Sequence, residues 1–82
     1  MAELKIRLYK IGDEQPETTV SIPGGILKFA TRLIPKPAAQ ALQEKGIDLD
    51  ELIRLSSTPG FSGTIVEVEL HKENQRVVIA IE

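Results

Sequence analysis

Cysteine is absent from this sequence of 82 residues, and histidine occurs once, as His71. Without thiols the chain can form no disulfide, no thiolate metal site and no cysteine nucleophile, a composition that fits a reducing compartment. No apolar run approaches the roughly 18 residues that a membrane-spanning helix requires, and the first residues do not have the pattern of a signal peptide. We therefore expect a soluble, cytoplasmic domain with no transmembrane segment.

An excess of positive charge is also missing. The formal net charge is −2 at pH 7, so a general attraction to nucleic-acid phosphates is not expected, and we predict no nucleic-acid partner. The length is too short for two domains, which predicts a single domain over residues 1–82. The sequence contains no internal repeat, no linker and no low-complexity tract.

Alternation of apolar and polar residues predicts the strands of this domain. In the first of them, Leu4, Ile6 and Leu8 share one face, which is the spacing of a half-buried strand. The predicted strands are residues 4–11, 18–22, 64–71 and 77–82. A polar turn separates the first strand from the second, and another separates the third from the fourth, so we expect two hairpins.

Between the hairpins the apolar spacing becomes helical, and three helices are predicted, over residues 26–34, 37–45 and 49–55. Pro35 ends the first helix because an interior proline lacks the N–H donor, whereas Gly46 ends the second as a left-handed residue. The predicted fold class is α+β, ordered strand–strand–helix–helix–helix–strand–strand. Its antiparallel-type sheet of two hairpins has the helices packed on one face.

The clearest local signal marks the start of the third helix. Asp48 as N-cap and Glu51 three residues later form a capping box, flanked by Ile47 and Leu52 at the spacing of a hydrophobic staple. The same acids could suggest calcium, but the spacing and central glycine of an EF-hand loop are missing. We assign them to capping, and we predict no metal ligands and no cofactor.

The periodicity also predicts the core and the order of the strands. The expected core residues are Leu4, Ile6, Leu8, Val20, Ile22, Phe29, Leu33, Leu42, Leu52, Ile53, Val66, Val68, Leu70, Val77, Ile79 and Ile81. Basic Lys5 and Arg7 lie on the polar face of the first strand, and acidic Glu67 and Glu69 on that of the third. Because opposite charges on neighbouring strands attract, we predict that the first and third strands are adjacent.

Candidate catalytic residues are few. Ser56, Ser57 and Ser62 lie near glycines, but a nucleophilic serine needs a base held by a third group. His71 is the conventional candidate, and it flanks a predicted turn where side chains are solvated. We interpret these serines as capping and turn residues and predict no catalytic site and no enzyme; an enzyme using Ser57 and His71 is a third alternative.

Two features could bind a partner or a ligand. The start of a helix at Gly24-Gly25, with Lys28 close by, could hold an anion, although it lacks the spacing of a phosphate loop. A small-ligand or anion-binding module is therefore the alternative function. Lys28, Arg32 and Lys36 recur every four residues and could meet an acidic partner or anionic lipid headgroups. A solvated helix face is the other interpretation of this row.

The outward faces of the strands carry more apolar surface than a solvated face needs. These residues are Tyr9, Ile11, Ile65, Val78 and Ala80. A contiguous apolar patch with a charged rim would suit a two-fold contact between copies. We interpret the chain as a non-enzymatic protein-interaction or assembly domain whose protein partner is unknown and could be a second copy, forming a homodimer. Peripheral contact with a membrane ranks below a protein partner.

Residues 18–23, 45–52, 63–69 and 77–82 resemble segments of a known family. They are similar to the β-rich C-terminal part of small bacterial SHOCT-like domain proteins of unknown function, which are found beside adhesin-type, envelope-stress-associated proteins. The resemblance covers nearly the whole chain. This sequence departs from the pattern in lacking the short N-terminal helical segment that many members carry. The resemblance implies a cytoplasmic accessory or assembly domain, and it supplies no catalytic residue.

Overall fold

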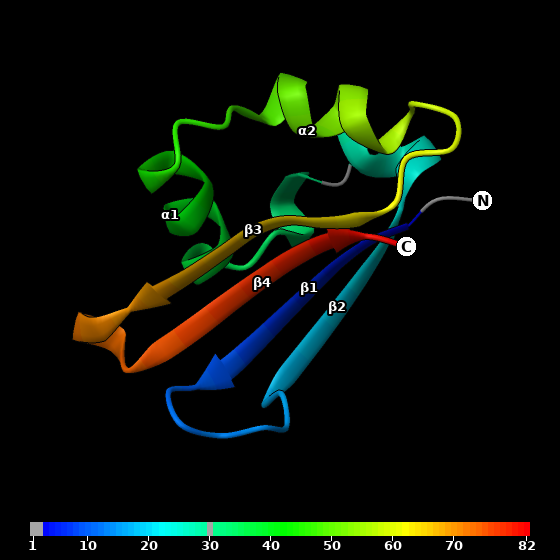
Figure 1. The fold of residues 1–82 in the computed structure, drawn as a ribbon. Helices are drawn as coiled ribbons and strands as arrows, with labels where there is room; N and C mark the ends of the chain where they lie inside the picture. The colour runs from blue at the N-terminus through cyan, green and yellow to red at the C-terminus, as the bar shows by residue number, and fades with distance from the viewer. Residues whose placement is uncertain (1–2, 30) are drawn as a thin grey trace.

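The computed structural model describes residues 3–29 and 31–82, apart from the side chains of Lys28 and Thr31. Its strands are β1 (Glu3–Lys10), β2 (Thr18–Pro23), β3 (Gly63–Leu70) and β4 (Gln75–Ile81). Its α-helices are α1 (Lys36–Glu44) and α2 (Leu49–Ser56), and its 3-10 helices are η1 (Gly24–Phe29), η2 (Thr31–Leu33) and η3 (His71–Glu73). The strands form one antiparallel sheet, and α1 and α2 lie on one of its faces (Figure 1).

The strand order in the sheet is β2-β1-β4-β3, so β4 lies between β1 and β3. The predicted contact between the first and third strands is therefore wrong. Residues 77–81 of β4 are apolar on both sides of the strand, which favours a central position, whereas Glu67 and Glu69 suit β3 to an edge. Arg7 of β1 pairs with Glu82, directly after β4, and not with Glu67 or Glu69 of β3.

The predicted order with three consecutive helices is also wrong. The 3-10 helices η1, from Gly24, and η2, to Leu33, stand in place of the predicted α-helix. The segment starts with two glycines, which disfavour a helix, and Pro35 limits its length. No Ser, Thr, Asp or Asn stands before it as an N-cap, and a short uncapped segment seldom recovers the cost of α-helix nucleation.

The second helix has the end that its glycine predicts. Gly46 adopts φ of +70°, where a side chain would be strained. Its N–H donates to the carbonyl of Gln43 at 3.1 Å, and the N–H of Ile47 donates to that of Leu42 at 3.0 Å. These two bonds make a Schellman motif, which satisfies carbonyls at the end of α1.

The predicted N-cap of α2 is confirmed. Asp48 has an extended backbone, and its Oδ1 accepts a hydrogen bond from the N–H of Glu51 at 2.8 Å. Ile47, directly before Asp48, packs against the core, and Leu52, one turn after Asp48, is buried. Because the Schellman motif ends α1 only two residues earlier, these local bonds determine where the chain turns between the helices.

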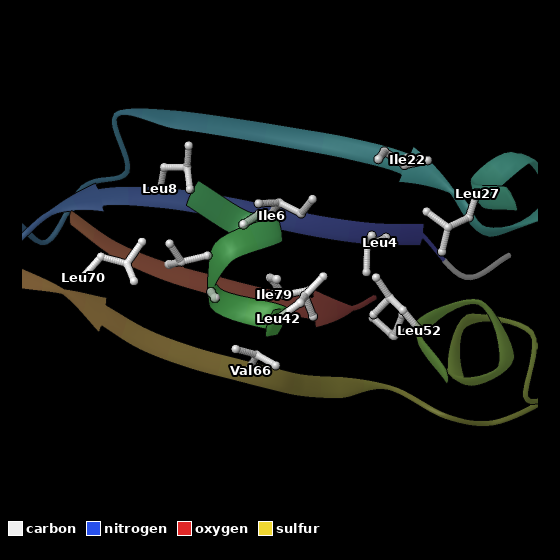
Figure 2. Close-up of a cluster of buried hydrophobic side chains, with 14 residues drawn as sticks. Leu4, Ile6, Leu8, Ile22, Leu27, Leu42, Leu52, Val66, Leu70 and Ile79 are labelled. Carbon is white, nitrogen blue, oxygen red and sulfur yellow. The ribbon is translucent and has the colours of Figure 1, made fainter. Parts of the chain in front are cut away.

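The core lies between the sheet and the helices. Figure 2 shows Leu42 of α1 above the middle of the sheet near Ile79, while Leu27 and Leu52 gather beside Leu4 at one end. The buried hydrophobic residues are Leu4, Ile6, Leu8, Ile22, Leu27, Ala38, Ala41, Leu42, Leu52, Val66, Leu70, Val77, Ile79, Ala80 and Ile81. Val20, Ile53 and Val68 are only partly buried against this cluster.

Two core predictions fail in the connector between β2 and α1. Phe29 and Leu33 are exposed, whereas Leu27, which was not among the predicted core residues, is fully buried. A 3-10 helix has three residues per turn, so the 3.6-residue spacing used for the prediction does not describe which side chains share a face. The change of helix type therefore moves a large aromatic side chain from the expected core to the surface.

Candidate functional site

The connector between β2 and α1 exposes large apolar side chains. Ile26 is 47% exposed, Phe29 78% and Leu33 57%, and these are the exposed large hydrophobic residues within 3–29 and 31–82. We call them the apolar knob. Ile26 and Phe29 are three residues apart, which places them on the same side of a 3-10 helix while Leu27 enters the core. The fold therefore directs the apolar side chains of Ile26 and Phe29 outward from one side of η1.

Positive charge accompanies the apolar knob. Arg32 and Lys36 are exposed in η2 and at the first residue of α1, whereas the side chain of Lys28 lies outside the described part of the chain. A cation at a helix N-terminus is unfavourable to the helix dipole, so Lys36 does not stabilise α1 through that effect. Residues 18–43 contain no Asp or Glu. The knob thus lies in a locally basic segment of a chain with net charge −2.

An apolar groove begins directly after the knob. It has a volume of about 450 Å³ and is lined by Ile34, Ala39, Leu42, Gln43, Gly46, Ile47, Asp48 and Leu49. Leu33 of the knob and Ile34 of the groove are consecutive residues, so the two features adjoin. The Schellman motif and the N-cap hold the far side of the groove, between the end of α1 and the start of α2.

The far side of the groove has the opposite charge to the knob. Residues 44–51 carry four acidic side chains and one basic side chain. Glu44, Asp48 and Asp50 are exposed, and one oxygen of Asp48 already accepts the helix-capping hydrogen bond. The apolar knob and the apolar groove are therefore neighbours that bear charges of opposite sign.

The face of the sheet opposite the helices has a different character, because its charged side chains pair with one another. Arg7 makes a bidentate contact with Glu82 at 2.8 and 3.2 Å. This hydrogen-bonded pair raises the pKa of Arg7 and lowers that of Glu82. The guanidinium of Arg76 lies 3.2 Å from the Glu67 carboxylate and 4.2 Å from the centre of the Tyr9 ring. We call this surface the ionic face.

The apolar residues predicted to form a patch on this face are all at least partly buried. Ala80 is only 5% exposed, and Tyr9 and Val78 are partly buried. Ile65 lies at a bulge, where the pairing of β3 shifts between Thr64 and Val66, and its side chain packs against the core. A bulge takes a side chain out of the regular alternation, so the period of two misplaced this residue.

The residues considered for catalysis do not converge. Ser62 immediately precedes β3, and His71 immediately follows it. A strand of this length spans roughly 25 Å, which separates His71 from the serines near Ser62. The buried Ser56 donates its hydroxyl hydrogen to the Ile53 carbonyl at 2.8 Å. Ser57 is the C-cap of α2, in agreement with the interpretation of these serines as capping residues.

The Gly24-Gly25 segment opens η1, a 3-10 helix of six residues. The dipole of such a short helix is small, so the feature that suggested an anion site is weaker than the predicted α-helix would have made it. Lys28, the proposed counter-charge, has a side chain outside the described residues. Within the described part of the chain, no three His, Cys, Asp or Glu residues are grouped so that they could hold a metal ion.

The fold and its surfaces define a small α+β domain with an ionic sheet face and an apolar knob and groove beside the helices. The chain belongs to the family described as "YvlB-like protein, C-terminal domain", whose model matches residues 3–80. No curated protein and no solved structure matches the chain.

This family supports the resemblance only at its coarser level, a small bacterial domain of unknown function. It does not confirm the likeness to SHOCT-like proteins or an association with adhesins. Among the residues that the structure describes, no helix has the length and apolar character needed to cross a membrane.

Proposed function

We propose that this domain is a non-enzymatic protein-interaction domain that docks to its partner through the apolar knob and the adjoining groove. The observation that carries the proposal is the exposure of Ile26, Phe29 and Leu33 within one connector. Exposed apolar side chains that are scattered singly are normal on proteins, whereas a cluster beside an apolar groove is typical of an interaction site.

The chemistry of this surface suits a protein partner. Aromatic and large aliphatic side chains supply much of the binding energy at protein interfaces, particularly when they enter a pocket on the partner. Arg32 and Lys36 beside the knob would form the polar rim that surrounds such contacts. Arginine is also enriched at interfaces, because its planar group pairs well with carboxylates.

The alternatives receive less support. An anion-binding module would use the start of η1 and Lys28, but this short 3-10 helix offers a weak dipole. The serine-based enzyme would need Ser57 and His71 to approach each other from opposite ends of β3. The cytoplasmic location and the association with SHOCT-like and adhesin-type proteins stay predictions.

Site-specific photo-crosslinking in the native cells tests the proposal. The photoreactive residue p-benzoylphenylalanine replaces Phe29, whose exposed side chain should tolerate the change. We expect ultraviolet light to produce a discrete protein adduct, which mass spectrometry then identifies. The photoreactive residue at Thr19, exposed on edge strand β2, is the matched control and should give no such adduct.

Two results would contradict the proposal. One is the absence of any protein adduct from position 29. The other is an identical set of adducts from positions 29 and 19, since this would show nonspecific contact over the whole surface. An adduct that disappears when Leu33→Glu is added would strengthen the assignment, because Leu33 belongs to the same apolar knob.

A further inference from the structure

We propose that the partner is a second copy of this chain, and that the apolar knob of each copy enters the groove of the other. This inference rests on the proposed function, because it names the occupant of the same surface. It differs from association through the ionic face, where the residues expected to form an apolar patch are at least partly buried. The shape of the groove, the charges around the knob and groove, and the position of the two on one surface support this occupant.

The shape of the groove supports this contact. Its volume of about 450 Å³ and its apolar lining could accommodate large hydrophobic side chains. Phe29 and Leu33 are exposed by 78% and 57%, so both could enter a partner without leaving the core. A pocket filled by an aromatic anchor is the usual arrangement at the centre of a protein interface. This one chain therefore carries both halves of such a contact.

The charges beside the knob and the groove favour a second copy over other partners. The knob lies beside Arg32 and Lys36, whereas Asp48 lines the groove, within a segment, residues 44–51, of four acidic side chains and one basic side chain. Inserting the knob of one copy into the groove of another would bring the cations near the acids. An anionic lipid surface would attract the cations, but it would be repelled by the acids and would leave the groove without an occupant.

The adjacency of Leu33 in the knob and Ile34 in the groove permits a two-fold contact. In a two-fold dimer each contact occurs twice, because residue i of one copy meets residue j of the other and the reverse. When a knob and a groove adjoin on one surface, a single two-fold axis between them could form both contacts together. The contact is then closed, and it produces a dimer without an open chain of copies.

Sedimentation velocity across the micromolar range tests the dimer. Phe29→Glu alters the knob and Ala39→Glu alters the groove; both sites are exposed, and unchanged far-ultraviolet circular dichroism spectra will verify that the variants fold. We expect the unmodified chain to dimerise and each variant to have a dissociation constant at least about thirtyfold higher. Leu33→Glu is a second knob variant, and Thr19→Glu on β2 is the control that should dimerise normally.

Mixing the two variants tests the geometry itself. The Phe29→Glu chain keeps an intact groove and the Ala39→Glu chain keeps an intact knob, so a mixed dimer retains one of its two contacts. Native mass spectrometry should therefore detect more heterodimer than either homodimer. If both variants remain monomeric in the mixture, the exchange of knob and groove is refuted.

Other outcomes separate this inference from the proposed function. A monomeric unmodified chain that crosslinks from position 29 to a different protein overturns the dimer but leaves the interaction domain intact. A monomeric chain that binds phosphatidylglycerol vesicles, and loses this binding in Phe29→Glu without any protein adduct, overturns both. Dimerisation that is unchanged in Phe29→Glu and Leu33→Glu overturns the dimer through this surface.

Discussion

The ionic face and the apolar knob differ in how far their apolar side chains are exposed to solvent. On the ionic face, Arg76 lies over the Tyr9 ring, and Val78 and Ala80 are at least partly buried. In the connector, by contrast, Phe29 projects with 78% of its surface exposed. The difference teaches that this small domain can shield apolar side chains with its own charged residues. Exposure of the knob is therefore a local property of the connector.

The largest expected effect comes from comparing neighbouring positions in the connector. Leu27→Ala removes a fully buried side chain and should lower the free energy of unfolding by about 2–5 kcal/mol. Phe29→Ala, two residues away, should change that of the monomer by less than about 0.5 kcal/mol, because that side chain is exposed. Chemical denaturation measures both. Equal losses would mean that the aromatic ring is part of the core.

A medium effect is expected at the far side of the groove. Asp48→Ala removes the acceptor for the Glu51 N–H and should cost about 1 kcal/mol. For a domain of this size, that corresponds to a fall of about 4–8 °C in melting temperature. Asp50→Ala, exposed in the same first turn, removes a favourable dipole charge without removing the cap. Calorimetry should show the larger fall for Asp48→Ala; the reverse order would refute the capping role.

A smaller effect is expected on the ionic face. Arg76→Ala removes both the ion pair with Glu67 and the stacking on Tyr9, which should together cost about 0.5–1 kcal/mol. Arg54→Ala, at an exposed position of α2, is the control for loss of one guanidinium. Urea denaturation compares the two variants. If Arg76→Ala is no less stable than Arg54→Ala, shielding by Arg76 does not stabilise the sheet.

The smallest effect depends on pH. The hydrogen bonds from Arg7 lower the pKa of Glu82 from its ordinary value of 4.5. The unfolded chain therefore binds this proton more tightly, so the stabilisation is fully present above pH 4.5 and is lost as the pH falls through the lowered pKa. Melting temperatures from pH 7 to pH 2 should show Glu82→Gln less stable near neutrality, with the difference vanishing in acid.

The exposed Glu73→Gln in η3 is the control for this pH dependence, since it removes one surface carboxylate outside the Arg7 pair. The two variants should differ near neutrality and converge in acid. A difference between Glu82→Gln and the unmodified chain that persists unchanged at pH 2 would contradict the ion pair as the cause.

The helix ends of this domain could be predicted because they depend on bonds between near neighbours. The cap joins Asp48 to Glu51, and the Schellman motif joins Gly46 and Ile47 to the last turn of α1. Such motifs need particular residue types within a few positions, so the sequence alone contains the information. The strands were located for a similar reason, since period-two alternation is local.

The apolar knob and the groove could not be predicted from the sequence in the same way. The helical spacing of residues 26–34 predicted an α-helix, but a flanking glycine pair and a proline leave a 3-10 segment that reverses which side chains face outward. Two residues of the knob, Phe29 and Leu33, were thus assigned to the core. The glycine pair and the proline are the local signals in the sequence that disfavour a regular α-helix here.

By itself, the sequence determined the positions of the strands, the caps of α1 and α2, and most of the core, because each depends on residue types at short spacing. Tertiary structure decided the strand order, the bulge at Ile65 and the groove between α1 and α2. The strand order requires segments distant in the chain to meet, as Arg7 and Glu82 do across 75 positions. Which distant segments pair depends on the packing of the whole core, and no local pattern contains that choice.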